Sequence, residues 1–121
     1  MKTLKVGIMP SEQFRQRVLD IAAGRYKPSS NEPKIWFSSL KSLDTIINEN
    51  NTRLLALIEK MKPASLEELA ELSGCQIRSL NKTLKTFERY GIIELKKENK
   101  LVKPIAKATK FQIEYKPSYA F

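Results

Sequence analysis

Apolar residues in the first 24 positions change from a spacing of two to the spacing of a helix. Alternation over residues 1–9 predicts a short strand that ends at Pro10. Ser11 is then expected to cap a helix, which Gly24 can end. The apolar side chains of this helix recur at helical intervals, at Phe14, Val18, Ile21 and Ala22. The segment therefore predicts a strand followed by an amphipathic helix.

A polar segment separates this arm from the rest of the chain. Residues 27–33, KPSSNEP, contain two prolines and no large apolar side chain, which is typical of an extended linker. We therefore expect an N-terminal strand-helix arm over residues 1–26 and a linker over 27–33. A folded domain is expected over residues 34–116 and a loosely held tail over 117–121.

Two helices are predicted in the first part of the folded domain. Ser39 can cap a short helix. The apolar side of this helix would contain Leu40, Leu43, Ile46 and Ile47. Asn51 or Thr52 can cap the second helix, and Pro63 prevents it from continuing much past Met61. Its inward-facing residues would be Leu54, Leu55 and Ile58.

The next two helices have the spacing of a helix-turn-helix motif. Ser65 to Glu68, SLEE, has the form of a capping box, which marks the start of a short helix. The apolar residues of this helix are Leu66, Leu69, Ala70 and Leu72. Small Ala70 lets the two helices approach closely, Gly74 permits a sharp turn, and Leu80 anchors the second helix in the core. The second helix is expected over Gln76–Tyr90 and is closed by Gly91.

This second helix has two chemically different faces. At 100° per residue, one stripe is apolar and contains Ile77, Leu80, Leu84 and Phe87. The nearly opposite stripe is basic and contains Arg78, Lys82, Lys85 and Arg89. Ser79, Thr83 and Thr86 lie beside the basic stripe. A basic stripe by itself is more typical of a solvated outer face, whereas its position after a short helix and a glycine turn favours contact with a DNA groove.

A β-hairpin is predicted directly after this helix. Ile92–Leu95 and Leu101–Ile105 would form its strands around a lysine-rich turn at Glu98-Asn99. The hairpin contributes Lys96, Lys97, Lys100 and Lys103 to a segment, residues 76–103, with eight basic and three acidic residues. These lysines would hold the DNA backbone, as a wing does, or would protect an edge hairpin from aggregation. A last strand is expected around Phe111, Ile113 and Tyr115.

These elements predict a fold of the α+β class that is mostly helical. The expected architecture is a winged helix-turn-helix with a three-helix core, a β-hairpin wing and an N-terminal strand-helix arm. Helix Gln76–Tyr90 would enter the major groove of DNA, and the wing, Ile92–Ile105, would lie on the backbone. The predicted DNA-binding residues are Gln76, Arg78, Ser79, Lys82, Thr83, Lys85, Thr86, Arg89, Lys96, Lys97 and Lys100.

The charge of the chain points to an anionic partner. Among 121 residues, 22 Lys and Arg against 13 Asp and Glu leave a formal net charge of +9. Nucleic acid is the first candidate and an anionic membrane surface the second. Because the chain has neither an apolar stretch of about 18–20 residues nor a leader-like N-terminus, we expect a cytoplasmic, nucleoid-associated protein without membrane contact.

Cysteine and histidine usage disfavours several kinds of site. One cysteine and no histidine exclude an internal disulfide and the usual zinc ligand sets. The commonest general base is also missing, and the chain has no glycine-rich phosphate loop. We therefore expect no cofactor, no metal and no enzymatic activity.

Residues 65–103 resemble the winged helix of the MarR and ArsR-like transcriptional regulators. The resemblance rests on Leu66–Ala70 (LEELA), Leu80–Leu84 (LNKTL) and Tyr90–Ile93 (YGII). The whole chain, with KIWFSSLKSL before the first core helix, is similar to small regulators that act as antitoxins in toxin–antitoxin operons. This resemblance implies a homodimer that represses its own operon, with the N-terminal strand and helix available to a cognate toxin. The long C-terminal dimerisation helix of larger MarR proteins has no counterpart in the pattern.

Three further features each allow two interpretations. Cys75 would be a redox-sensitive thiol at a helix N-terminus or a small core residue. The aromatic side chains of Trp36, Phe37 and Tyr90 would stack on bases or pack in the core. The carboxylates of Glu67, Glu68 and Glu71 would form a metal or acid-base site, or would simply reflect the preference of a first helical turn for acids.

Three functions follow from these alternatives. The first is sequence-specific binding of double-stranded DNA by a dimer, favoured by the helix-turn-helix spacing and the basic face. The second is a protein-interaction module whose arm neutralises a partner, with DNA binding secondary. The third, an enzyme that acts on nucleic acid, would need clustered carboxylates or a metal.

Overall fold

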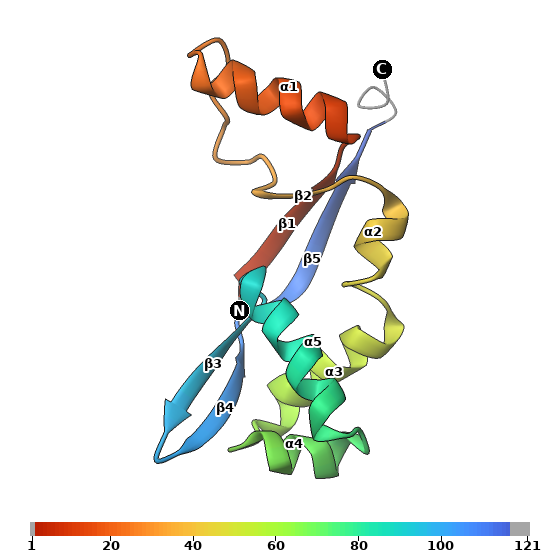
Figure 1. The fold of residues 1–121 in the computed structure, drawn as a ribbon, viewed down its shortest axis with the longest axis vertical. Helices are drawn as coiled ribbons and strands as arrows, with labels where there is room; N and C mark the ends of the chain where they lie inside the picture. The colour runs from red at the N-terminus through yellow and green to blue at the C-terminus, as the bar shows by residue number, and fades with distance from the viewer. Residues whose placement is uncertain (1, 117–121) are drawn as a thin grey trace. The chain divides into compact units, whose positions relative to one another are not determined.

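The computed structural model describes residues 2–116 as an α+β protein with five helices and five strands (Figure 1). The predicted tail, 117–121, lies outside the described residues. The chain divides into two compact units. Residues 46–110 form most of one, the helical unit, which also takes in the start of β1 up to Thr3. Residues 4–45 and 111–116 form the other, the sheet unit.

The sheet unit is built on three strands in the order β2-β1-β5. The strands are β1 (Lys2–Ile8), β2 (Ile35–Phe37) and β5 (Ala108–Tyr115), whose first residues belong to the helical unit. Strands β1 and β2 are parallel, and Gly7 lies opposite Trp36. The unit also contains α1 (Ser11–Ala22) and α2 (Leu40–Asp44).

Side chains alternate across this sheet as the period of a strand requires. Val6, Ile8 and Phe37 are buried and share one face. Gly7 and Trp36 share the other face, and the indole lies so close that a Cβ on Gly7 would be 2.3 Å from the ring carbon Cζ3. Position 7 therefore has room for glycine alone unless the indole moves.

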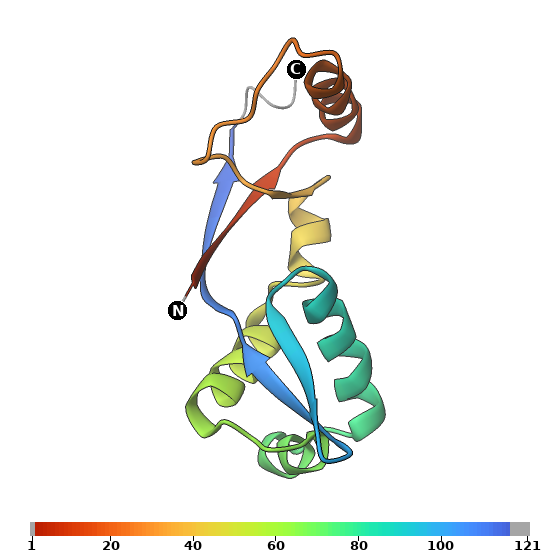
Figure 2. The same ribbon diagram turned by 90° about the vertical axis from the view of Figure 1, so that its left-hand side faces the viewer.

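The helical unit consists of three helices and an antiparallel hairpin (Figure 2). Its elements are α3 (Glu49–Met61), α4 (Leu66–Ser73), α5 (Ile77–Arg89), β3 (Ile93–Glu98) and β4 (Leu101–Ala106). Helix α5 packs on α4 and β3, and β4 packs on α3 and α4. The core contains Leu54, Leu55, Ile58, Leu69, Leu80, Leu84, Phe87, Ile92 and Ile93. Each helix contributes its apolar stripe to this core, which accounts for most of the burial that stabilises the unit.

The helix ends follow local capping chemistry. Ser39 caps α2, as predicted, and accepts a hydrogen bond from the amide of Ser42. Ser65 caps α4 in the same way by accepting from the amide of Glu68. The Glu68 carboxylate accepts from the amide of Ala64 instead of closing back on Ser65. Of the two hydrogen bonds of the predicted capping box, only the one from the Glu68 amide to the Ser65 hydroxyl forms. The Glu68 carboxylate binds the amide of Ala64, one residue before Ser65.

Two predicted caps are wrong. The N-cap of α3 is Asn48, whose side chain accepts from the amide of Asn51, so neither Asn51 nor Thr52 is the cap. Several polar residues near the start of this helix could act as its cap. The N-cap is the one with extended backbone, and the turn after α2 gives this conformation to Asn48. Helix α1 starts at Ser11 with Pro10 as its N-cap residue and no side-chain cap. The carbonyl oxygen of Pro10 accepts a hydrogen bond from the amide of Phe14, so the first hydrogen bond of the helix forms without a serine side chain.

The division into units differs from the predicted boundaries. Residues 27–33 have no regular secondary structure, as predicted, but lie inside the sheet unit together with α1, β2 and α2. The predicted last strand is present as β5, and it adds to β1. Pairing of strands that are about 100 residues apart leaves no local signature in a sequence.

Candidate nucleic-acid interface

Helix α5 is held by a glycine turn at each end and by a row of buried side chains. Gly74, which ends α4, has a φ of 72°, and Gly91, after α5, has a φ of 75°. Both lie in the left-handed region that favours glycine. Three residues of α5 are buried at helical spacing, namely Leu80, Leu84 and Phe87. The helix is therefore fixed about its own axis, with one side in the core.

The opposite side of α5 is basic and exposed. Its four basic residues, Arg78, Lys82, Lys85 and Arg89, are all exposed, and they lie within about 60° of one another on the helix. Within residues 2–116, no ion pair engages any of them. Exposed guanidinium and ammonium groups of this kind can donate hydrogen bonds to phosphates and base edges.

The hydroxyl residues beside this face differ in their exposure. Ser79 is exposed, whereas Thr83 and Thr86 are half-buried. The Thr86 hydroxyl donates to the carbonyl oxygen of Lys82 at 3.1 Å, so its proton is used within the helix. Gln76, the N-cap residue, is exposed and makes no capping hydrogen bond with its side chain. The groups at the N-terminal end of α5 are therefore the more accessible ones.

Ile77 does not belong to the buried stripe to which its spacing assigned it. It is 44% exposed because it is the first residue of α5, one turn ahead of Leu80 and at the edge of the helix-helix contact. Cys75 is also exposed, so its interpretation as a core residue is wrong. Its thiol lies 3.8 Å from the carbonyl oxygen of Ser73.

The hairpin places Lys96 and Lys103 on its outer face, Lys97 on its inner face and Lys100 at its tip. Ile93, Leu95 and Lys97 share the inner face with residues 102, 104 and 106. Lys96 lies on the outer face directly opposite Lys103. Like charges across a strand pair repel each other, so a phosphate between these two lysines would relieve the repulsion.

The turn of the hairpin lies one residue later than predicted. Asn99 and Lys100 form the two-residue connection, and both have positive φ values, 49° and 69°. Positive φ at both positions is the geometry of a type I′ turn, which matches the twist of the strands. Lys100 is exposed at this tip in a conformation that glycine adopts more readily.

Two acidic side chains in the hairpin are paired with lysines. Glu94 lies 2.8 Å from Lys107, and Glu98 lies 3.4 Å from Lys96. The hydrogen bond from Lys107 and its positive charge lower the pKa of Glu94. The two pairs reduce the local excess of positive charge, and Lys96 shares its charge in this way. Among the predicted hairpin lysines, Lys97 and Lys100 have no such pair within residues 2–116.

Figures 1 and 2 show the first turn of α5 and the tip of the hairpin at the same end of the helical unit. The basic groups in the first turn of α5 and at the hairpin tip thus lie at one end of a single packed unit, whereas Arg89 lies in the last turn of the helix. The sequence predicted both sets of residues but not this placement, which depends on how β3 packs against α5.

Other candidate chemistry is not assembled in the described part of the chain. Residues 2–116 contain no cluster of three or more potential metal ligands among Cys, Asp and Glu. Phe37 is buried, whereas Trp36 and Tyr90 are half-buried. No helix described within these residues has the length and apolar character needed to cross a bilayer.

Comparison with known proteins identifies a family through the helical unit. Neither the curated proteins nor the solved structures compared with the chain give a match. Residues 46–113 match the HVO_A0114 family model. The matched segment starts just before α3, includes both candidate DNA-binding elements and ends within β5. Because this segment is more than half of the sequence, the chain belongs to the HVO_A0114 family.

Proposed function

We propose that the helical unit is a winged helix-turn-helix that binds double-stranded DNA with sequence preference and regulates transcription. The observation that carries this proposal is the exposed, unpaired basic face of α5 directly opposite its buried side. The order of elements, three helices and then a hairpin, fits the proposed architecture. The resemblance of residues 65–103 to MarR and ArsR-like regulators supports the same assignment.

Helix α5 would enter the major groove with its N-terminal turns nearest the bases. Arg78 can donate two hydrogen bonds to a guanine edge, and the Gln76 amide has the donor and acceptor that pair with adenine. Lys82, Lys85 and Arg89 would neutralise phosphates along the groove. In the hairpin, Lys97 and Lys100 would contact the neighbouring backbone, which positions the helix without reading sequence.

DNA fits this surface better than the two alternatives. An anionic membrane binds helices that place large apolar side chains beside their basic residues. The exposed basic stripe of α5 has polar residues on both sides, Ser79 and Thr86 on one and Asn81 and Glu88 on the other. The exposed apolar residue of this helix, Ile77, lies about 100° around the axis from Arg78. A face that serves only for solvation would not require a basic, glycine-stopped helix and a lysine-tipped hairpin at the same end of one unit.

Affinity for duplex DNA should fall steeply as salt concentration rises. Each phosphate neutralised by Lys or Arg releases counterions, so a site with about five such contacts gives a log-log slope near −4.5. Fluorescence anisotropy with a labelled promoter fragment at several salt concentrations measures this slope. A scrambled duplex is the control for sequence preference. Absence of duplex binding at low salt would contradict the proposal.

Replacing Lys100 by Gly should separate the folding role of the hairpin turn from its charge. Glycine adopts the positive φ of position 100 without steric strain, so we expect stability to rise by about 0.5–1 kcal/mol. The lost charge should reduce the salt slope of DNA binding by about 1. Thermal unfolding and anisotropy measure the two effects. Asn99→Gly, which changes the same turn and keeps Lys100, should retain the wild-type slope, and an equal loss in both variants would argue against a phosphate contact by Lys100.

A further inference from the structure

A small cavity opens between the C-terminal end of α3 and strand β4 of the hairpin. It is lined by Ile58 and Glu59 of α3, by Lys62 just after the helix, and by residues 103–106 of β4. Its volume is about 260 Å³, a little below the roughly 300–1,000 Å³ of sites for drug-sized ligands. All of the lining residues belong to the helical unit, so the cavity lies inside one compact body and suits a small molecule.

The inner wall of this cavity is apolar and fixed. Ile58 is 1% exposed, Ala106 is 8% exposed, and Pro104 is fully buried. Ala106 contributes only a methyl group to the wall, which leaves room beside Ile58. The opening remains because α3 ends here. Lys62 has a φ of 47°, in the left-handed region, and Pro63 follows it. An apolar group placed in this space would leave water and contact mainly hydrocarbon.

Three charged side chains line the same cavity. Lys62 is exposed, and Lys103 and Glu59 are half-buried. Within residues 2–116, no ion pair engages any of the three. Two ammonium groups against one carboxylate leave an excess of positive charge beside the apolar wall. A ligand with an anionic group would therefore gain attraction here without displacing an existing partner.

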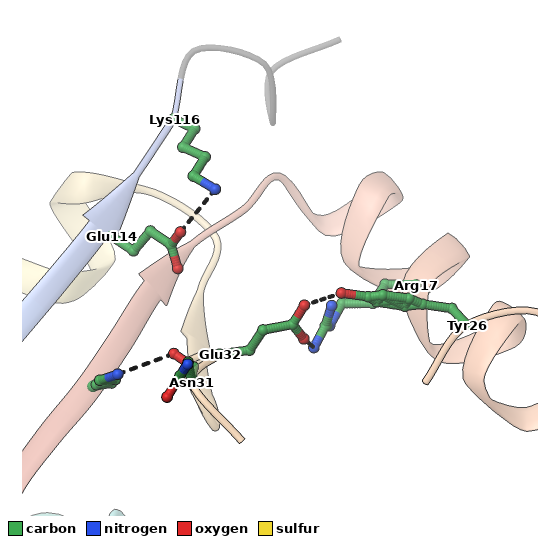
Figure 3. Close-up of polar contacts among 7 residues, drawn as sticks. Arg17, Tyr26, Asn31, Glu32, Glu114 and Lys116 are labelled. Atoms are coloured by element: carbon green, nitrogen blue, oxygen red, sulfur yellow. Dashed lines mark hydrogen bonds and ion pairs between the residues drawn. The ribbon is translucent and has the colours of Figure 1, made fainter. Parts of the chain in front are cut away.

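Charged side chains beside two cavities of the sheet unit already have partners. Figure 3 shows the Arg17 guanidinium of α1 next to the Glu32 carboxylate, at 2.7 Å, and it also lies 5.1 Å from the ring centroid of Trp36. These contacts hold α1 by its polar side, and no residue of α1 is buried, so its apolar side stays exposed. The same figure shows Glu114 paired with Lys116 at 2.9 Å. Arg17 and Glu114 each line a cavity, but their charges are used within the chain.

The free edge of β4 does not suit a peptide strand. Hydrogen-bonded pairs alternate along an antiparallel hairpin, and the amide of Lys107 donates to the carbonyl oxygen of Ile92. Positions 102, 104 and 106 therefore direct their backbone groups away from β3. Position 104 is proline, which has no N–H to offer an added strand. A small molecule, which needs no row of backbone partners, is the occupant that fits.

We propose that the cavity between α3 and β4 binds a small organic acid. Its apolar body would pack against Ile58, Pro104 and Ala106, and its carboxylate would lie beside Lys62 and Lys103. A cavity of this size holds about eight heavy atoms, for which we expect a dissociation constant of about 1 mM. This site goes beyond the proposed function and does not depend on it, because binding is measured without DNA.

Hexanoate is an acid of suitable size to test this site by NMR on the ¹⁵N-labelled full chain. At concentrations up to about 20 mM, well above the expected dissociation constant, the amide resonances of Ile58, Ile105 and Ala106 should shift and saturate, whereas those of β2 should not shift. Hexan-1-ol has the same alkyl chain without the charge and should bind about fivefold more weakly. Absence of saturable shifts at these amides, or equal affinity for the acid and the alcohol, would overturn the proposal.

Two double variants test the role of the lysines in this cavity. Lys62→Gln combined with Lys103→Gln should lower the affinity for hexanoate about fivefold, because partly exposed ion pairs each contribute a small factor, and should leave the affinity for hexan-1-ol unchanged. Arg53→Gln combined with Lys60→Gln removes the same formal charge from exposed residues of α3 that do not line the cavity, and it should bind hexanoate as the wild type does. Equal losses in the two double variants would mean that net charge alone attracts the acid, and would overturn the proposal. An unchanged affinity for hexanoate in the first double variant would do the same.

Replacing Glu59 by Gln should act in the opposite direction. This change removes a carboxylate that repels the carboxylate of the ligand, so we expect the affinity for hexanoate to rise about twofold and that for hexan-1-ol to stay the same. Glu49→Gln removes the same charge from the first turn of α3, away from the residues that line the cavity, and is the control. An unchanged or lower affinity for hexanoate in Glu59→Gln would overturn the proposed placement of the ligand.

Discussion

Replacing Arg78 and Lys82 together by Ala should reduce affinity for specific DNA by about 100-fold at moderate salt. A bidentate arginine contact with a base is worth about 1–3 kcal/mol, and a lysine-phosphate contact adds an electrostatic contribution that salt weakens. Both side chains are exposed on the basic face of α5 and have no ion pair within residues 2–116. Their removal should therefore leave the fold intact. Anisotropy titrations measure the affinity, and circular dichroism checks the helix content.

A second double variant separates a specific surface from net charge. Arg53 and Lys60 are exposed basic residues of α3 in the same unit. Arg53→Ala combined with Lys60→Ala removes the same formal charge from a different helix. We expect this variant to bind within about threefold of wild type, since long-range charge effects are screened over roughly 10 Å. Equal losses in the two double variants would refute the assignment of α5 as the recognition helix.

Replacing Leu84 by Ala should destabilise the helical unit by about 3 kcal/mol, within the range measured for buried leucines. The Leu84 side chain has no exposed area and lies between Leu80 and Phe87 on the buried side of α5. For a domain of this size, that loss corresponds to a fall in melting temperature of about 10–20 °C. DNA binding should be lost over the same temperature interval, because the basic face depends on this packing. Thermal denaturation followed by circular dichroism measures the effect.

The adjacent residue provides the control for this core variant. Lys85 is exposed, so Lys85→Ala should change stability by less than about 0.5 kcal/mol while weakening DNA binding. Substitutions at these two adjacent positions would thus have different effects. Leu84→Ala would lower stability, and Lys85→Ala would weaken DNA binding. Similar melting temperatures for the two variants would show that α5 is not anchored by its apolar side.

Agreement between sequence and structure is closest where the signals are local. The predicted helix Gln76–Tyr90 matches α5 to within one residue at each end, because Gly74 and Gly91 limit it and a regular apolar stripe runs along it. The hairpin and the helix that follows Ser65 were also predicted from local signals, namely apolar periodicity bounded by turn or capping residues. The exposure of the basic residues also follows from periodicity, since a stripe opposite a buried stripe must face outward.

Errors occur where the outcome depends on neighbours in space. Ile77 has the right spacing for the core but is the first residue of α5, and it remains 44% exposed. Asn48 caps α3 although Asn51 and Thr52 carry equally suitable side chains. Lys100 takes a turn position where glycine would be expected, and the register of the two strands places it there. In each case several local choices have similar energies, and long-range packing selects one.

The local pattern of residues determined most of the helices and strands, and which side of α5 is apolar and which is basic. It did not indicate the short strand β2, Ile35–Phe37. Tertiary structure alone decided that β1 pairs with β2 and β5, and that Arg17 holds α1 by its polar side with its apolar side outward. The physical reason is that helical periodicity and capping act over a few residues. Strand pairing and cation-π contacts join groups that are distant in the chain, so their energies appear only when the whole chain is folded.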